Sequence, residues 1–252
     1  MWPLICWKQR VNGAAHCRII RRILSLRRGL KNKIGFHVAC NQAIDHYVIR
    51  PIYLFSDSQL LFWSEGSGPL IARVLPQGKP VEEVSAAYIG ASNGDNPDYF
   101  EIFRQAMLNI DVESSLMIPS QPTSMEIDFL KSADIILLAG GEVKLGWEVM
   151  CANGVVKIVM ERYKQGAALI GISAGAIQLS LKGFEADHSF DTFQLVPFII
   201  DVHDEANAWE RLKEYAAEYP GIKAYGIPFG AGLIYHLDKR VEMLRYQSFE
   251  CL

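Results

Sequence analysis

Short runs of wholly apolar residues, separated by amphipathic segments, set the fold class of this chain. Residues 86–92 (AAYIGAS), 135–141 (IILLAGG) and 167–173 (AALIGIS) lack the polar alternation of a half-exposed strand. Between them, Phe100, Phe103 and Met107 recur at helical spacing. Strands that are apolar on both sides belong to a parallel sheet covered by helices on both faces. The sequence therefore predicts an α/β fold with a doubly wound, mostly parallel sheet.

Charge divides the chain into two predicted parts. No Asp or Glu occurs from Met1 to Ile44, although that stretch is rich in Lys and Arg. A block of one sign is typical of an appendage outside the core. We therefore expect residues 1–48 to be a basic extension, either disordered or upstream of the native start, and residues 49–252 to form one α/β domain. The alternative for the segment from Cys17 to Phe36 is a basic amphipathic helix that lies on a membrane or acts as an organelle presequence.

Composition excludes several classes of function. The net charge of −3 argues against general nucleic-acid binding, which requires a basic surface. No apolar run reaches the roughly 20 residues needed to span a bilayer. The 5 cysteines are scattered and lack the spacing of a zinc site. They predict free thiols in a cytoplasmic, reducing compartment, with no metal or organic cofactor.

The motif G-x-S-x-G at Gly171, Ser173 and Gly175 carries the predicted chemistry. It follows an apolar strand and opens an apolar-periodic helix, which is the context of a nucleophile elbow. Small neighbours allow the tight turn that exposes the serine hydroxyl. The N–H of Ala174, at the start of the helix, and the N–H of Gly141, at the end of another buried strand, are the predicted oxyanion donors.

A serine hydroxyl requires a neighbouring base to take its proton. His203 follows the apolar run FII at 198–200 and is expected at the tip of a strand, near the elbow. His188, in the polar loop from Gly183 to Gln194, is the alternative. We predict that His203 is the base. A lone histidine is otherwise a surface or structural residue.

These motifs resemble the aspartyl dipeptidase (peptidase E) and cyanophycinase family of serine peptidases, whose fold is similar to class I glutamine amidotransferases, a flavodoxin-like three-layer arrangement. The resemblance runs from about Ile49 to Arg245. It rests on the elbow from Gly171 to Ala176, the turn Gly140-Gly141-Glu142, the segment Asp201-Val202-His203, and the pair Arg211-Leu212.

The resemblance implies a Ser-His-acid triad that cleaves short peptides, with Asp-Xaa dipeptides as the substrate. The cyanophycinase branch carries its acid in a G-I-D-E-D segment, but residues 226–230 here read GIPFG. The dipeptidase branch implies Asp187, with Glu185 and Asp191 as alternatives. Arg211 and Glu142 are the predicted substrate-binding residues. A homodimer is left open.

Two other functions fit the same residues. An esterase or amidase would use the same elbow on another acyl group. A non-catalytic binding protein on an amidotransferase-like scaffold would explain the acid missing from residues 226–230. Covalent labelling of Ser173 by a fluorophosphonate separates the enzymes from the binding protein.

Overall fold

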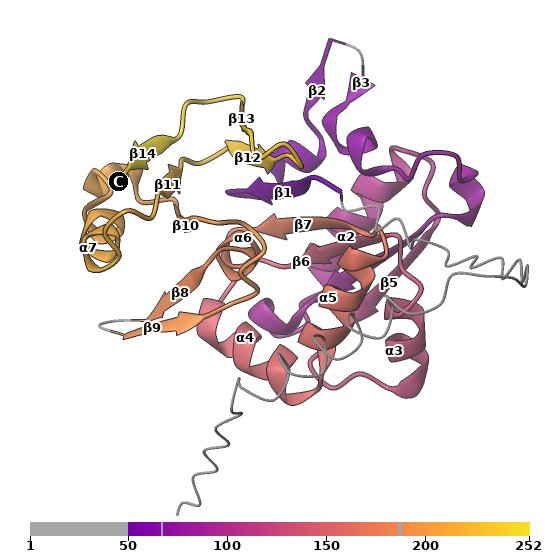
Figure 1. The fold of residues 1–252 in the computed structure, drawn as a ribbon. Coiled ribbons are helices and arrows are strands. Elements are labelled where there is room, and N and C mark those ends of the chain that lie inside the picture. Colours follow the sequence, from indigo (N-terminus) through magenta and orange to yellow (C-terminus); the bar gives the residue numbers. More distant parts are fainter. Residues whose placement is uncertain (1–49, 67, 186–187) are drawn as a thin grey trace, which may run out of the picture. The chain divides into compact units, whose positions relative to one another are not determined.

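A seven-stranded sheet in the order β13-β12-β1-β7-β6-β4-β5 organises the domain (Figure 1). Strands β1, β7, β6, β4 and β5 are parallel, and β12 and β13 join the β1 edge as antiparallel strands. Our structure is a computed structural model that describes residues 50–252, apart from residues 67, 186 and 187. The predicted extension, residues 1–48, lies outside the described residues.

The strands and helices are short and follow each other closely. The strands of the main sheet are β1 (Ile52–Phe55), β4 (Ser85–Ile89), β5 (Ser114–Ile118), β6 (Ile135–Leu138), β7 (Ala168–Ile172), β12 (Gly232–Tyr235) and β13 (Val241–Leu244). The described helices are α2 (Pro97–Leu108), α3 (Ser124–Leu130), α4 (Val143–Ala152), α5 (Val155–Lys164), α6 (Ala174–Leu179) and α7 (Glu210–Glu218). Residues 58–84 add 3-10 turns and the hairpin β2 (Ser64–Glu65) and β3 (Gly68–Pro69).

Alternate residues of each central strand enter different apolar layers. Ile136 and Leu138 pack in one layer with residues of α3, α4, α5 and α6. Ile135 and Leu137 pack in the other with residues of α2. All four side chains are at most 1% exposed. Because both faces of the sheet are covered, the strands carry no polar face, and the predicted three-layer α/β fold is confirmed.

A second, small sheet contains β10 (Ile199–Val202), β11 (Ala224–Ile227) and β14 (Phe249–Cys251). β10 is parallel to β11, and helix α7 packs on both. The apolar run before His203 therefore ends at the tip of a separate sheet. The polar segment after α6 forms the hairpin of β8 (Lys182–Glu185) and β9 (His188–Asp191). No helix among the described residues has the length and apolarity to cross a bilayer.

An ion pair between residues that are distant in the sequence joins β13, at the edge of the main sheet, to a 3-10 turn. Both oxygens of Glu242 accept hydrogen bonds from Arg73, each at 2.9 Å, and Glu242 Oε2 lies 2.6 Å from His236 Nε2. These contacts lower the pKa of Glu242 from 4.5 to about 2, with the Arg73 bond as the largest cause. The carboxylate is three-quarters buried, and the guanidinium is partly exposed.

We expect Glu242→Gln to remove an acid-sensitive part of the stability. A lowered pKa in the folded state stabilises the fold fully above the unfolded-state pKa, and this stabilisation is lost as pH falls from 4.5 toward 2. The gap in unfolding free energy between wild type and Glu242→Gln should shrink across that window, by at most about 2 kcal/mol because solvent screens the pair. Urea unfolding at several pH values measures it. The exposed Glu113→Gln is the control, and an equal, pH-independent gap for both variants contradicts the prediction.

Candidate functional site

Ser173 stands at the turn between β7 and α6, in a backbone conformation that serine rarely adopts. Its φ is 51° and its ψ is −109°. Its N–H donates to Phe55 O at 2.9 Å, which anchors the turn to β1. Residues are held in such conformations when the surrounding structure over-determines them, most often at functional sites. The side chain is partly exposed, as the predicted elbow requires.

The glycines of the elbow are required by close backbone contacts. A Cβ on Gly175 would lie 2.2 Å from Leu138 O on strand β6, and a Cβ on Gly171 would lie 2.5 Å from Gly175 O. Both are backbone oxygens, which cannot move aside as the end of a flexible side chain could. The motif therefore permits both the tight turn and the close approach of α6 to β6.

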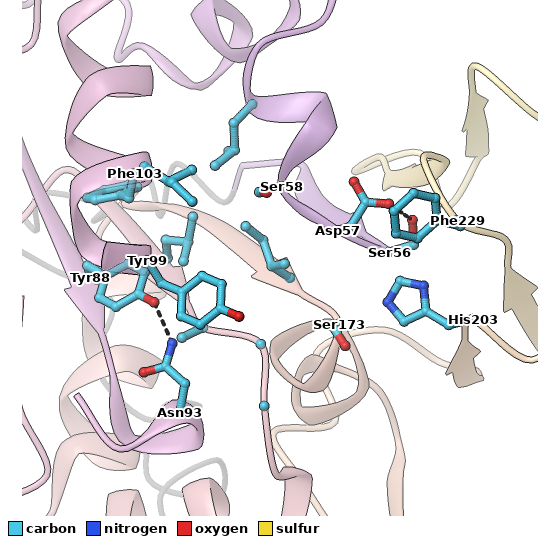
Figure 2. Close-up of a pocket in the computed structure, with 17 residues that line it drawn as sticks. Ser56, Asp57, Ser58, Tyr88, Asn93, Tyr99, Phe103, Ser173, His203 and Phe229 are labelled. Atoms are coloured by element: carbon cyan, nitrogen blue, oxygen red, sulfur yellow. Dashed lines mark hydrogen bonds between the residues drawn. The ribbon is translucent and has the colours of Figure 1, made fainter. Parts of the chain in front are cut away.

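His203 follows β10 and reaches the same cavity as Ser173 from the second sheet (Figure 2). Its φ is 60°, and its N–H donates to Ile227 O on β11 at 3.2 Å. The imidazole packs against Phe229, with 5.7 Å between ring centroids. Among the contacts of the described residues, no hydrogen bond joins Ser173 Oγ to the imidazole. Such bonds often tighten only in the substrate complex.

His188 and His236, the other two histidines that the structure describes, lie elsewhere. His188 starts strand β9 of the hairpin and does not line the cavity, and His236 contacts Glu242. Of these three histidines, only His203 shares a cavity with Ser173. This placement favours His203 over His188 as the base.

Two backbone N–H groups beside Ser173 have no hydrogen-bond acceptor among the described residues. Gly141 follows β6 with φ 131°, and Ala174 is the first residue of α6. Gly140 packs next to the elbow, since a Cβ on it would lie 3.3 Å from Ser173 Cβ. The geometry is suited to holding an oxyanion formed at Ser173.

We expect Gly141→Ala to lower kcat for a peptide substrate by about 10²- to 10³-fold, the loss typical of one oxyanion donor. A Cβ there would lie 2.0 Å from Ser92 O, so the turn must move. Gly154→Ala is the matched control, because Gly154 also has a positive φ, 77°, but has open space around it. Steady-state kinetics measures the loss of kcat, and thermal melts of the same samples measure any loss of stability. Equal kcat values for the two variants contradict the assigned donor.

The cavity around Ser173 holds about 370 Å³, within the usual range for a small-ligand site. Its lining combines the chemical groups above with a mostly apolar wall. The lining residues are Ser56, Asp57, Ser58, Leu61, Tyr88, Asn93, Tyr99, Ile102, Phe103, Leu137, Ala139, Gly140, Gly141, Ile172, Ser173, His203 and Phe229.

Of the three carboxylates proposed for the triad, Glu185 is the last residue of β8 and Asp191 is the last residue of β9. Asp187 lies outside the described residues. Glu185 pairs with Lys144, and Asp191 accepts from Lys182 at 2.7 Å. Neither Glu185 nor Asp191 lines the cavity. Their side chains are 54% and 69% exposed, as is usual for solvated surface charges.

Arg211 and Glu142, the predicted substrate-binding residues, do not line the cavity. Arg211 donates through Nε at 3.0 Å and Nη2 at 2.5 Å to the buried carboxylate of Asp201, and the Asp201 bond raises the pKa of Arg211. This bidentate contact holds the strand that precedes His203, which gives Arg211 a structural role. Glu142 precedes α4, its side chain is exposed, and its N–H donates to Ser92 O at 2.7 Å.

Sequence reasoning missed Asp57, the one carboxylate among the described residues that line the cavity. Asp57 follows β1, and its two oxygens accept from the N–H groups of Gln59 and Gly230. It thereby fastens the loop between β11 and β12 to the end of β1. The signal was present, because Asp57 lies at the carboxyl end of a parallel strand, where sites gather.

Comparison with known proteins identifies the family. The model of peptidase family S51 matches residues 75–242, which include the elbow, His203 and the turn after β6. The chain belongs to peptidase family S51. The resemblance to peptidase E inferred from the motifs is confirmed. Membership of family S51 classes the chain as a serine peptidase.

Three known proteins are similar to this S51 member, the first in sequence and the other two in fold. An uncharacterized peptidase, YgaJ, of Bacillus subtilis (strain 168) is 30% identical over 97 residues; the match covers 38% of this chain and 42% of that protein. A putative peptidase E protein from Listeria monocytogenes EGD-e superposes with a TM-score of 0.60 at 17% identity, covering 79% of this chain and 99% of the other. A peptidase from an acI-B1 Actinobacterium superposes with a TM-score of 0.56 at 15% sequence identity, and the match covers 81% of this chain and 95% of the other.

Proposed function

We propose that this S51 peptidase hydrolyses short peptides by acyl transfer through Ser173. The observation that carries the proposal is the shared cavity. A strained serine from the main sheet and an imidazole from the second sheet line one pocket of about 370 Å³. Two separate elements converge there, which a structural turn would not require.

Each residue has a distinct role in the proposed reaction. Ser173 Oγ attacks the peptide carbonyl while the His203 imidazole takes its proton, and His203 then returns that proton to the leaving amine. The N–H groups of Gly141 and Ala174 hold the oxyanion of the tetrahedral intermediate. Water then attacks the acyl-enzyme with His203 again as the base, and the carboxylic acid product is released from Ser173.

The acid of the triad stays a prediction. Asp187 remains the proposed residue, because it lies at the offset from the elbow that the resemblance implies. Glu185 and Asp191 have the weaker case, since each is paired with a lysine outside the cavity. The cytoplasmic location likewise stays a prediction, and the homodimer is still left open.

A panel of matched substrates tests the proposal. We expect hydrolysis of unblocked dipeptides, on a panel that includes Asp-Xaa, and no turnover of simple alkyl esters above their spontaneous hydrolysis. Amine release, followed by mass spectrometry, reports the reaction. The Ser173→Ala protein controls for contaminating peptidases. Ester turnover without any peptide cleavage favours the esterase alternative, and no turnover of either class contradicts the proposal.

A further inference from the structure

The cavity has two chemically different ends, one on each side of Ser173 (Figure 2). His203, Asp57 and Phe229 lie at one end. The other end is a compartment of aromatic and aliphatic side chains, which we call the aromatic compartment. Figure 2 shows Tyr88, Tyr99 and Phe103 at this end, and the compartment also includes Leu61, Ile102 and Leu137, which line the cavity and pack in the same apolar cluster as Tyr88 and Phe103. These residues come from the 3-10 turn Ser58–Leu61, β4, α2 and β6.

Burial makes the aromatic compartment a preformed apolar site. Leu61, Phe103 and Leu137 are at most 1% exposed. The rings of Tyr88 and Phe103 pack together, with 5.6 Å between centroids. Tyr99, which is 54% exposed, stands at the rim. A wall of rigid aromatic side chains favours an apolar group of comparable size, because binding there removes the apolar surface of that group from water.

The Tyr88 phenol of the aromatic compartment is neutral and already accepts a hydrogen bond. Burial raises the pKa of the Tyr88 phenol to about 12, so it stays protonated. Asn93 Nδ2 donates to Tyr88 Oη at 2.7 Å. None of the described residues that line the cavity is a lysine or an arginine, and Asp57 adds a carboxylate. An acidic side chain would therefore lose its hydration without gaining a cation.

The proton path determines which part of the substrate enters the aromatic compartment. His203 must return its proton to the leaving amine, so the leaving group lies on the His203 side of Ser173. The acyl part then extends to the opposite side. That side is the aromatic compartment.

We propose that the residue on the acyl side of the scissile bond carries an apolar side chain of aromatic size, which binds in the aromatic compartment, and that acidic residues are disfavoured there. This inference rests on the proposed function. It replaces the Asp-Xaa preference implied by the family resemblance with a preference read from the lining of this cavity.

Two covalent probes test the inference directly. Diphenyl α-aminoalkylphosphonates bearing a phenylalanine or an aspartate side chain differ only in the group that enters the compartment. We expect the phenylalanine analogue to label Ser173 with a second-order rate constant at least tenfold higher. Equal or faster labelling by the aspartate analogue overturns the inference and leaves the serine peptidase intact. Failure of both analogues and of a simple fluorophosphonate to label the folded protein overturns the proposed function with it.

A charge-introducing variant provides an independent arm. Tyr99→Arg places a cation at the compartment rim on an exposed position, and we expect it to shift the phenylalanine-to-aspartate ratio at least tenfold toward aspartate. Met125→Arg on α3, where the side chain is 66% exposed and outside the cavity lining, is the matched control. It should leave the ratio unchanged. An unchanged ratio in Tyr99→Arg, with both proteins folded by circular dichroism, contradicts the assignment.

Discussion

Ser173→Ala is expected to lower kcat for a cleaved peptide by about 10⁴- to 10⁶-fold, because the acyl-enzyme can no longer form. The residual rate comes from substrate binding and the oxyanion donors. Folding should not suffer, since the Ser173 hydroxyl makes no hydrogen bond among the described residues. Steady-state kinetics and a thermal melt of the same samples measure both properties.

Ser173→Gly separates catalysis from backbone strain. Glycine adopts φ 51°, ψ −109° far more readily than alanine does, so Ser173→Gly should be more stable than Ser173→Ala by about 1 kcal/mol while both are inactive. Urea unfolding compares the two variants. If alanine proves the more stable, the strain assigned to the turn is absent; if either variant keeps near-native kcat, the nucleophile is another residue.

His203→Ala should cost about as much activity as Ser173→Ala, because the hydroxyl is a poor nucleophile without its base. The two side chains act as one unit, so the double variant should lose little more than either single variant. Added imidazole should restore part of the His203→Ala rate and none of the Ser173→Ala rate. His188→Ala, on the hairpin, is the control with near-native kinetics.

If the fold-loss in kcat of the double variant equals the product of the two single-variant losses, His203 and Ser173 act separately. A large loss in His188→Ala with little effect of His203→Ala would assign the base to the hairpin. Either result contradicts the roles derived from the shared cavity.

The main sheet and the elbow were predictable because local patterns determine them. Apolar runs such as 135–139 are buried on both faces, and close backbone contacts at Gly171 and Gly175 leave no room for a side chain. The separate sheet of β10, β11 and β14 was not predictable. Its strands β10 and β11 have the same apolar pattern as the strands of the main sheet. In addition, β11 and β12 lie in one apolar stretch of sequence but belong to different sheets, with the change at residues 228–231.

The substrate end of the site was the least predictable part. The guanidinium of Arg211 is suited to binding a substrate carboxylate, but no local sequence pattern shows that it already donates hydrogen bonds to Asp201. The aromatic compartment joins residues from the 3-10 turn, β4, α2 and β6, which are distant in the sequence. Only Asp57 was predictable from the sequence, because it lies just beyond the carboxyl end of the parallel strand β1.

The central claim is that Ser173 is the activated nucleophile of this S51 peptidase. Reaction of the whole chain with a fluorophosphonate, followed by intact mass and peptide mapping, tests it most directly. We predict one adduct, on Ser173, formed much more slowly in His203→Ala and absent in Ser173→Ala. An adduct on another residue, or no adduct on folded protein, would contradict the account.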